Sequence, residues 1–542
     1  MRWWGWGDDE HAFSLSAPAA DLLRAELGME GSERGPRVAI EDVALPESGL
    51  TAPARHALEA AVGSEHVQDD RAARVTHAVG KSFADLVQMR TGDGSSAPDA
   101  VVAPGSEEQV AAVIAACVAH GVAVIPFGGG TSVVGGVAAL RGAHPGAISL
   151  DLGRMNRVLD IDRDSLTAAF EPGLLGPELE RLLGAEGLTL GHFPQSFEFS
   201  TVGGWVATRS AGQASTGYGR IDELVESVRC VAPAGELATR EVPASAAGPT
   251  LRELLVGSEG TLGVITAARL RVRARPQARH YEAWSFRSFE EGVEAYRLME
   301  QADASPDVAR LSDGHETRLS KALAATGSAG ERVADAYLRL RGHGDACIAF
   351  AGFEGTPDDV ARRRGRAAEL LRAGGGVALG RRPGRSWLKG RFSAPYLRDE
   401  MLDRGVMVET LETATTWSNL HRLYAAVGGA LRESLAARGT PPIVMCHVSH
   451  LYRSGASLYF TFIARQQQEA SLDQWWAAKG AACDAIVSTG GTISHHHAVG
   501  RDHTPWMGEE VGELGLDVLR AAKQRLDPAG IMNPGKLIPD RS

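Results

Sequence analysis

Cysteine is scarce in this 542-residue chain, and its spacing excludes the common cysteine motifs. The five cysteines lie far apart, and no pair has CxxC spacing: Cys117, Cys230, Cys347, Cys446 and Cys483. Their number is odd, and most of them lie in apolar runs. We therefore expect reduced, packed thiols in a reducing compartment, and no catalytic cysteine.

Long apolar runs are also missing. No stretch approaches the roughly 18 uninterrupted apolar residues that a membrane span needs. The opening MRWWGWGDDE has no apolar core of a signal peptide, and the closing PDRS is neither a peroxisomal nor an ER address. We expect a cytoplasmic protein whose membrane contact, if any, is peripheral and at the inner face.

Positive charge is neither abundant nor clustered. The chain has 56 lysines and arginines against 67 acidic residues, which gives a net charge of −11. Without basic runs interleaved with aromatic residues, a nucleic-acid partner is not expected. The content of 44% hydrophobic residues suffices for more than one core. Abundant alanine, arginine and glycine favour a GC-rich bacterial source.

Residues 1–90 predict a helical N-terminal segment, and an α/β pattern begins at Asp99. The stretch DAVVAPGSEEQVAAVIAACVAHGVAVIPFGGGTS predicts a strand, a helix capped by Ser106 and ended by Gly121, a second strand and a glycine loop. Within this helix, five apolar residues recur on one face: Val110, Val113, Ile114, Cys117 and Val118. A second αβ unit has its helix at 177–186, and further strands are expected at 227–231 and 263–272.

The pattern changes near Pro276, where YEAWSFRSFEEGVEAYRLMEQ predicts a strand and then a helix. We expect a loop near 373–385, a helix near 417–435, and two strands in VMCHVSHLYRSGASLYFTFIA. The chain should end in a helix and a turn-rich tail. The domain ranges that follow are 1–90, 91–275, 276–485 and 486–542.

Glycine-rich loops indicate a phosphate-bearing ligand. PFGGGTSVVGG follows a strand, and its glycines let main-chain N–H groups converge on an anion, with Thr131 and Ser132 adding hydroxyl groups. This loop has neither a Walker ending nor a GxGxxG pattern, and a tight turn is the alternative. STVGG and GSEGTLGVIT are two further loops of small residues, so a large ligand laid across several loops is favoured.

These segments carry a resemblance to a known superfamily. PFGGGTSV, STVGG, TGYGRIDELV and GSEGTLGVIT, in this order, resemble the FAD domain of the vanillyl-alcohol-oxidase flavoproteins. RWWGWGD, GHFPQSFEFSTVGGWVATR and TGGTISHHHAVG are similar to segments of the alkyldihydroxyacetonephosphate synthase family. The resemblance implies an α+β fold: a PCMH-type FAD-binding domain over 91–275, an α+β cap domain with a large antiparallel sheet over 276–485, and a C-terminal segment over 486–542 that packs back on the FAD site.

The resemblance also implies the residues that contact FAD. The pyrophosphate loop would comprise Pro126, Gly128, Gly129, Gly130, Thr131, Ser132 and Val133. The remaining contacts would be His192, Thr201, Gly204, Ser210, Ser215, Gly217, Gly219, Glu259, Gly260 and Ile265. The first loop has no histidine, so we expect the FAD to be bound non-covalently.

The family exchanges the acyl group of an acyl-dihydroxyacetonephosphate for a fatty alcohol, through a flavin N5 adduct and without net electron transfer. By resemblance, Tyr459 is the candidate acid/base, the segment His495, His496 and His497 tunes it, and Arg398 and Arg310 are candidates for binding anionic substrate groups. A packed strand aromatic is the alternative for Tyr459, and an ion pair with Asp399 or Glu400 is the alternative for Arg398.

The three adjacent histidines leave other interpretations open. On a strand, alternation would place two rings on one face and one on the other. A metal site that includes His447 and His450 is conceivable, but no carboxylate or cysteine joins the histidines at a usual spacing, so no metal is expected. Solvated or packed histidines are the third interpretation.

Two other functions compete with ether synthesis. One is an FAD-dependent 2-hydroxyacid dehydrogenase or oxidase, although HVSHLYRSGASLYF and SHHHAVG replace the metal-binding motifs of those relatives. The other is a catalytically silent flavin-binding module. We also expect a lipid-like substrate, a homodimer, and peripheral membrane contact through an exposed patch of Trp3, Trp4 and Trp6, with burial of these rings as the alternative.

Acid precipitation of the purified protein tests whether FAD is bound non-covalently. The purified protein should be yellow, and acid precipitation should release the flavin into the supernatant, since the first loop offers no histidine for attachment. Absorbance of pellet and supernatant measures this. A yellow pellet would contradict non-covalent binding, and a colourless protein that ignores added FAD would contradict the fold assignment.

Overall fold

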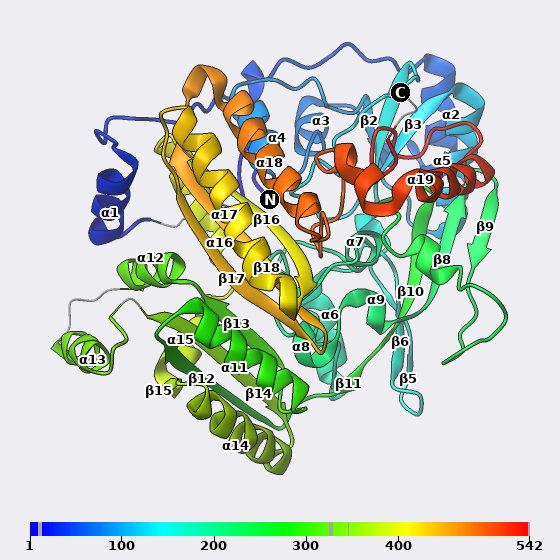
Figure 1. Ribbon diagram of the computed structural model, residues 1–542. Coiled ribbons are helices and arrows are strands. Elements are labelled where there is room, and N and C mark those ends of the chain that lie inside the picture. Colours follow the sequence, from blue (N-terminus) through cyan, green and yellow to red (C-terminus); the bar gives the residue numbers. More distant parts are fainter. Residues whose placement is uncertain (9–13, 325–328, 345, 540–542) are drawn as a thin grey trace.

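The computed structural model describes residues 1–542 except 9–13, 325–328, 345 and 540–542. Three main sheets organise the chain: two smaller ones in the first half and a seven-stranded one in the second half. In Figure 1 the first two sheets lie on the right and the large sheet runs diagonally on the left, under its own helices. The last helix, α19 (Met507–Leu526), lies beside the first two sheets, far from the large sheet that precedes it in the sequence.

The first sheet has the strand order β1-β2-β4-β3. Its strands are β1 (Val67–Gln68), β2 (Ala100–Val102), β3 (Val122–Phe127) and β4 (Gly146–Asp151), and β2 and β3 both pair parallel to β4. Helix α5 (Glu107–His120) joins β2 to β3; the Ser106 hydroxyl accepts the N–H of Gln109, and Gly121 ends the helix in a left-handed conformation. Four of the five predicted apolar residues are buried on this helix, whereas Val118 is exposed.

The N-terminal segment is not purely helical. It contains α1 (Ala17–Leu27), α2 (Ala52–Val62), α3 (Arg71–Thr76) and α4 (Phe83–Arg90), but β1 joins the first sheet by pairing antiparallel with β2. The tail joins the same sheet: the N–H of Val124 donates to the carbonyl of Ile531 (2.8 Å), and the N–H of Asn533 donates to the carbonyl of Val124 (2.9 Å). Both ends of the chain therefore contribute to the first domain.

The second sheet is antiparallel, with the order β5-β6-β10-β8-β9. Its strands are β5 (Val158–Asp162), β6 (Thr167–Phe170), β8 (Val225–Ala232), β9 (Gly235–Ala238) and β10 (Val264–Arg271). The helices of this part are α6 (Gly176–Ala185), α7 (Val202–Thr208), α8 (Ser215–Tyr218), α9 (Ile221–Leu224) and α10 (Arg252–Leu255). A short pair, β7 (Leu188–Thr189) with β11 (Arg273–Ala274), leads to the large sheet.

The large sheet, which we call the cap sheet, is antiparallel with the order β15-β12-β14-β13-β17-β18-β16. Its strands are β12 (Ala278–Phe286), β13 (Val308–Ser312), β14 (Cys347–Gly355), β15 (Val377–Gly380), β16 (Val406–Thr416), β17 (Ile443–Tyr452) and β18 (Gly455–Arg465). The helices of this part are α11 (Phe289–Gln301), α12 (Gly314–Ala324), α13 (Ala329–Leu340), α14 (Pro357–Ala373), α15 (Arg381–Gly390), α16 (Ala394–Asp403), α17 (Leu420–Ala437) and α18 (Ser471–Ser488).

The two faces of the cap sheet have different partners, as β18 shows. Leu458, Phe460 and Phe462 belong to one large core with α11, α14, α17 and α18. Tyr459 and Thr461 point to the other face and line a cavity. The period of two along a strand thus separates packing residues from site residues.

One local prediction is wrong. The segment 373–385, expected to be a loop, contains β15 and the start of α15. Strand β15 pairs with β12, where Trp284 faces Ala378. A partner almost 100 residues away stabilises this strand, so the glycines and arginines of the segment gave no local sign of it.

The predicted tryptophan patch is also wrong. Trp6 is only 3% exposed, and the ring of Trp4 lies under the guanidinium groups of Arg2, Arg37 and Arg90. Trp3 packs against the buried cluster around Val43 and Val79. Trp6 is thus buried and Trp3 and Trp4 are half-buried, so none of the three rings is exposed.

Candidate active site

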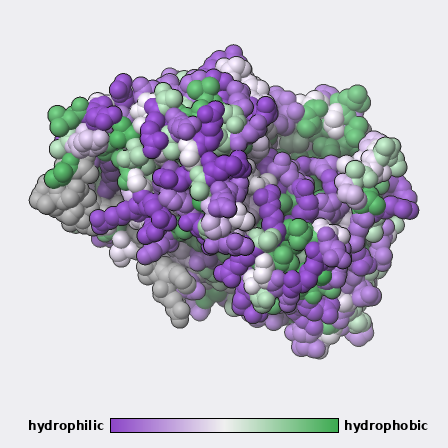
Figure 2. All heavy atoms as spheres, turned by 90° about the horizontal axis from the view of Figure 1, so that it is seen from below, coloured by the Kyte–Doolittle hydropathy of each residue, from purple (hydrophilic) through white to green (hydrophobic). Residues whose placement is uncertain are grey.

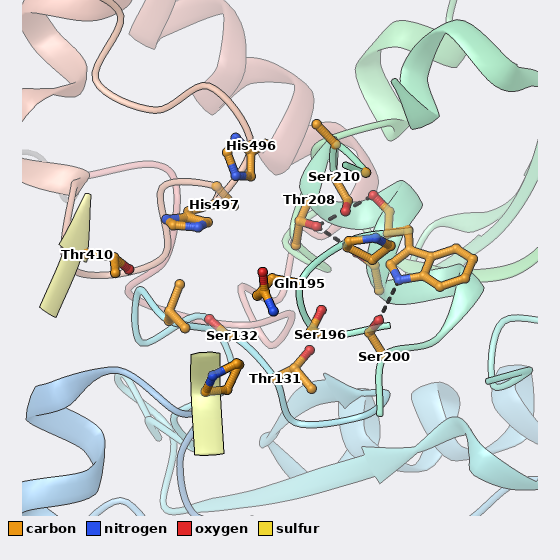
Figure 3. Close-up of a pocket in the computed structure, with 18 of the residues that line it drawn as sticks. Thr131, Ser132, Gln195, Ser196, Ser200, Thr208, Ser210, Thr410, His496 and His497 are labelled. Atoms are coloured by element: carbon orange, nitrogen blue, oxygen red, sulfur yellow. Dashed lines mark hydrogen bonds between the residues drawn. The ribbon is translucent and has the colours of Figure 1, made fainter. Parts of the chain in front are cut away.

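A cavity of about 500 Å³ lies between the first two sheets and the cap sheet. Figure 3 shows Thr131 and Ser132 of the glycine loop on one side of it, with His496 and His497 facing them across the opening. The predicted residues that line the cavity are Pro126, Gly128, Gly129, Gly130, Thr131, Ser132, Val133, Thr201, Gly204, Ser210, Glu259, Gly260, Ile265, Arg310, Arg398, Tyr459, His496 and His497. Residues from seven separate stretches of the chain therefore meet at one site.

Five predicted residues do not line the cavity. His192 is buried behind Ser210, with its Nε2 3.2 Å from the Ser210 hydroxyl. Ser215 accepts the N–H of Gly212 (2.8 Å), and Gly217 and Gly219 belong to the turn at α8, where the N–H of Gly217 donates to Asp307 of the cap. His495 lies behind His496. The structure gives His192, Ser215, Gly217 and Gly219 no direct access to a ligand in this cavity, and their contact with FAD stays a prediction.

The glycine loop is suited to an anion. Within the described chain, none of the hydrogen bonds uses the main-chain N–H groups of residues 128–133 as donors. At Gly129 an added Cβ would lie 1.7 Å from the carbonyl oxygen of Phe199, and at Gly130 the backbone has a φ of +64°. The loop thus needs its glycines for close backbone packing and leaves a run of donors for a phosphate-bearing cofactor.

The segment after the histidines closes this side of the cavity. The carboxylate of Glu259 accepts the N–H groups of Val499 (2.9 Å) and Gly500 (2.7 Å). Burial raises the pKa of Glu259 to about 7, although these two donors oppose the shift. Its main-chain carbonyl accepts the Asn533 side-chain amide at 2.7 Å. Glu259, predicted as an FAD contact, therefore also fixes the C-terminal segment.

Tyr459 is surrounded by imidazole rings. His447 stacks on it with ring centroids 4.9 Å apart, and His496 lies nearly parallel at 6.0 Å. His497 meets the tyrosine ring edge-on at 5.4 Å. Tyr459 and His447 come from the paired strands β18 and β17, and the other two rings come from the loop after α18.

A single buried carboxylate organises that loop. Glu412 of β16 accepts the main-chain N–H groups of His495 (2.6 Å), His496 (3.0 Å) and His497 (2.8 Å), together with the hydroxyl of Ser494 (2.9 Å). The three histidines therefore lie on a loop wrapped around one acceptor, and the alternation that a strand would impose on their rings does not apply. Ala498 follows with a φ of +73°, a conformation that non-glycine residues rarely adopt.

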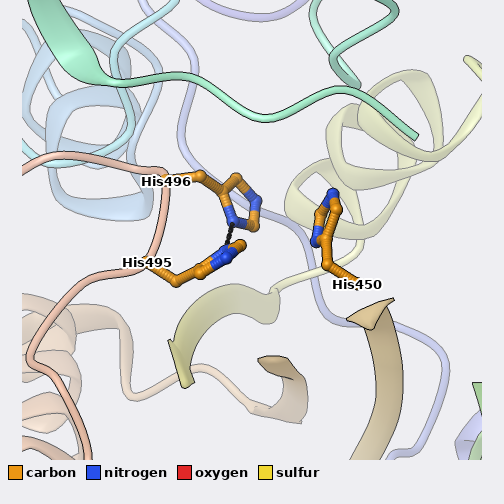
Figure 4. Close-up of side chains that lie close together, drawn as sticks. All are labelled: His450, His495 and His496. Carbon is orange, nitrogen blue, oxygen red and sulfur yellow. Dashed lines mark hydrogen bonds between the residues drawn. The ribbon is translucent and has the colours of Figure 1, made fainter. Parts of the chain in front are cut away.

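His450, His495 and His496 form a tight cluster beside Tyr459 (Figure 4), with ring nitrogens within 4.8 Å of one another. Hydrogen bonds already engage most of these nitrogens. His450 contacts the carbonyl of Gly212 (2.9 Å) and the hydroxyl of Ser457 (3.1 Å), and His495 contacts His496 (2.9 Å) and the hydroxyl of Tyr452. To ligate a cation, the cluster would have to give up these bonds, so it is built as a hydrogen-bonded array.

The protonation states follow from burial. Burial raises the pKa of Tyr459 to about 12, and it lowers the pKa values of His496 and His497 in spite of the nearby Glu412. Burial also opposes ionisation of Glu412, but the histidines and the N–H donors outweigh it and hold its pKa well below the ordinary value. At neutral pH the site therefore combines a protonated phenol, neutral imidazoles and an ionised carboxylate.

The two predicted arginines differ in their surroundings. Arg310 forms an ion pair with Glu316, which also binds His447 (3.1 Å). Arg398 on α16 is buried, and its Nε has no hydrogen-bond partner among the residues that the structure places. The alternative for Arg398, an ion pair with Asp399 or Glu400, is not among the ion pairs of the described chain. A buried, unpaired guanidinium nitrogen beside a cavity favours an anionic ligand.

Sequence reasoning missed several residues of the site. Trp6, Gln195, Glu316 and Thr410 line the cavity, and Glu412 holds the histidine loop. Trp6 and Gln195 stand within the stretches that resemble the synthase family, so they were open to identification as candidates. Nothing local to Glu316 or Thr410 points to a site.

Comparisons with known proteins agree with this geometry. Residues 98–240 match the family described as FAD binding domain, and residues 275–537 match FAD linked oxidases, C-terminal domain. The alkyldihydroxyacetonephosphate synthase of Dictyostelium discoideum is 34% identical over 99% of this chain and 93% of its own length. The chain belongs to the alkyldihydroxyacetonephosphate synthase family.

Other members of this family are similar over nearly the same range. The alkyldihydroxyacetonephosphate synthase of Trypanosoma brucei brucei is 35% identical over 91% of the chain and 82% of its own length. A solved alkyldihydroxyacetonephosphate synthase is 32% identical, with a TM-score of 0.86 and coverage of 99% of both chains. The source of the chain, expected to be bacterial, stays a prediction from composition.

The predicted fold class and cofactor are confirmed. The α+β architecture with a large antiparallel cap sheet matches the solved synthase, and p-cresol methylhydroxylase shares the fold at 17% identity and a TM-score of 0.66. FAD is the cofactor: the FAD binding domain matches, and the glycine loop offers free N–H donors to a phosphate-bearing group.

Proposed function

We propose that this chain exchanges the acyl group of an acyl-dihydroxyacetonephosphate for a fatty alcohol and so forms an ether. The observation that carries the proposal is Tyr459, protonated and enclosed by neutral imidazoles, in the cavity of a chain that belongs to the synthase family. The exchange is redox-neutral. The carbon–oxygen bond to the acyloxy group breaks, that group leaves as a carboxylate, and a new bond forms to the alcohol oxygen as its proton is released.

When bound, FAD would supply a covalent trap for the substrate carbon, without net electron transfer. The proposed contacts with it are the lining residues 126–133, 201, 204, 210, 259, 260 and 265. His192 and Ser215 support these contacts from behind the cavity wall, because they bind Ser210 and Gly212, which line it. Gly217 and Gly219 lie one layer further back, where the N–H of Gly219 donates to the carbonyl of Ser215.

Tyr459 moves the proton at the substrate carbon. Since burial raises its pKa to about 12, the phenol gives up a proton only to a nearby acceptor. His496 and His497 are such acceptors, because burial keeps their imidazoles neutral. His495 fixes the orientation of His496 through the contact between their Nδ1 atoms. The imidazoles of His496 and His497 and the phenol of Tyr459 thus act together in proton transfer.

The two arginines are proposed to bind the anionic groups of the substrate, and an apolar wall of the cavity is proposed to bind its alkyl tail. Arg398, with its unpaired Nε, is the proposed receptor for an anionic group. Arg310 contributes from β13, and Glu316 partly compensates its charge. An apolar wall suited to an alkyl tail lies between α12, α16 and the cap sheet: Leu319, Leu397, Met401, Met445 and Ile463.

The decisive experiment is anaerobic turnover with acyl-dihydroxyacetonephosphate and a fatty alcohol, comparing the wild type with Tyr459→Phe. We expect ether and free fatty acid to form in the wild type without any electron acceptor. The variant should bind FAD normally and lose about 10²- to 10⁴-fold in rate, because it keeps the ring and lacks only the hydroxyl. Mass spectrometry of the products measures both.

The competing 2-hydroxyacid chemistry gives the opposite result. In that case a compound such as D-lactate would bleach the flavin, an acceptor would restore it, and the acylated phosphate ester would give no product. That outcome would overturn the proposed activity and leave the family fold in place.

We further propose peripheral membrane contact through α13. Among the described residues no helix is both long and apolar enough to cross a bilayer, and in Figure 2 hydrophilic residues dominate one face, with scattered hydrophobic patches. On α13, however, Val333, Tyr337 and Leu340 are exposed at a spacing that puts them on one helix face. This helix follows α12, whose Leu319 and Ser320 line the cavity, so a substrate could enter there from a lipid surface.

Flotation with phosphatidylcholine vesicles measures this contact. The double variant Val333→Ser, Leu340→Ser should lose most of its vesicle binding, because it removes apolar area that inserts into the interface. Leu514→Ser, which changes an equally exposed leucine on α19, should bind as the wild type does. Equal flotation of all three proteins would contradict contact through α13. The expected homodimer rests on family resemblance, and sedimentation equilibrium tests it.

A further inference from the structure

The N-terminal segment Arg2–Gly7, which we call the strap, lies inside the molecule. Figure 1 places the N-terminus near the centre, close to α4 and α18. Trp6 is buried, lines the active-site cavity, and meets Phe199 edge-on with ring centroids 5.9 Å apart. A segment far from the catalytic residues in sequence is therefore part of the wall of the site.

The strap holds the cap helix that carries Arg398. The N–H of Trp6 donates to Oδ2 of Asp399 (2.7 Å), and Nη1 of Arg2 lies 3.9 Å from the same oxygen. The strap closes on itself, since the N–H of Arg2 donates to the carbonyl of Gly7 at 2.6 Å. Asp399 follows Arg398 on α16, so these bonds fix the turn of helix from which Arg398 enters the cavity.

The strap is also tied to the first domain. The ammonium of Lys81 donates to the carbonyl of Arg2 (2.7 Å), while the main-chain N–H of Lys81 donates to the carbonyl of Ser132 in the glycine loop (2.6 Å). Arg90 of α4 donates to the carbonyl of Trp4 (3.3 Å). One short peptide thus connects the cofactor loop to the helix of Arg398.

Two glycines let the strap approach α16 this closely. A Cβ on Gly5 would lie 2.4 Å from Oδ2 of Asp399. Gly7 has a φ of +73°, and a Cβ there would lie 2.3 Å from the ring of Tyr396. Any larger residue at these positions would push against the residues that flank Arg398.

We propose that the strap is a positioning element that aims Arg398 at the anionic group of the substrate. Arg398 needs such support because its Nε is buried and has no partner among the described residues, so a ligand must supply the acceptor. Trp6 and Gly5 act through Asp399 and do not touch the reacting atoms. This inference rests on the proposed function, in which Arg398 binds the anionic group.

Calorimetric titration of the FAD-loaded protein tests the strap, with dihydroxyacetone phosphate and decanol as separate probes. In Gly5→Ala the added methyl group would collide with Asp399, and Trp6→Ala removes the ring that packs on Phe199 while it keeps the main-chain bond. Each change displaces the turn of α16 that carries Arg398, so we expect the Kd for the phosphate ester to rise about tenfold or more. The Kd for decanol should stay unchanged in Gly5→Ala, whereas a general packing defect would weaken both probes. Trp6→Phe, which keeps an aromatic ring against Phe199, should raise the Kd for the phosphate ester less than Trp6→Ala does.

Gly429→Ala on α17 is the matched control, because an added methyl group meets nothing within 4 Å there. FAD content and Tm show whether each variant is folded; if Trp6→Ala fails to fold, Gly5→Ala and Trp6→Phe decide the matter. An unchanged Kd for dihydroxyacetone phosphate in Gly5→Ala overturns the strap inference. Failure of the wild type to bind dihydroxyacetone phosphate overturns the proposed function instead, so the two failures are distinguishable.

Discussion

The site depends on one buried carboxylate. Glu412 lies in β16 of the cap sheet and accepts three consecutive main-chain N–H groups and a serine hydroxyl from the loop after α18. Such a concentration of donors keeps the carboxylate ionised in spite of its burial. It also forces the loop into a tight wrap that brings His496 and His497 against Tyr459.

The same loop then connects the cap to the first domain. After Ala498 the chain reaches Glu259, which accepts the N–H groups of Val499 and Gly500, and the tail later adds to the first sheet at Val124. The strap makes a second connection, from the glycine loop through Lys81 to Asp399. The catalytic side chains and the cofactor loop belong to different domains, and these polar ties set the distance between them. The cavity therefore has its shape because both chain ends return to its walls.

Local patterns predicted the parts that local forces stabilise. The helix after Ser106, the strand pair containing Tyr459 and the glycine loop were all evident, because capping, alternation and glycine clusters act over a few residues. The resemblance supplied the fold and placed Tyr459, Arg398 and Arg310 at one cavity. Local sequence patterns did not predict the long-range contacts. Strand β15 pairs with the distant β12, Glu412 binds a loop about 80 residues later, and Trp6 binds Asp399 across 393 residues. The errors on the 373–385 loop and the tryptophans come from such contacts, and so does the loop conformation of the histidine triplet.

The most direct test of this account is the rate of Glu412→Gln beside that of Glu409→Gln. Both residues are buried carboxylates of β16 that accept N–H donors, but Glu409 binds Phe83 and Trp475 on the helix-covered side of the sheet. Each substitution replaces a carboxylate oxygen, which accepts N–H groups, by an amide NH₂ group, which cannot accept them. It should therefore lower the free energy of unfolding by about 1–3 kcal/mol. We expect both variants to bind FAD, and Glu412→Gln alone to lose at least about tenfold in acyl-for-alcohol exchange, as general acid–base help is disturbed. Full exchange activity in Glu412→Gln would contradict the central role of this carboxylate.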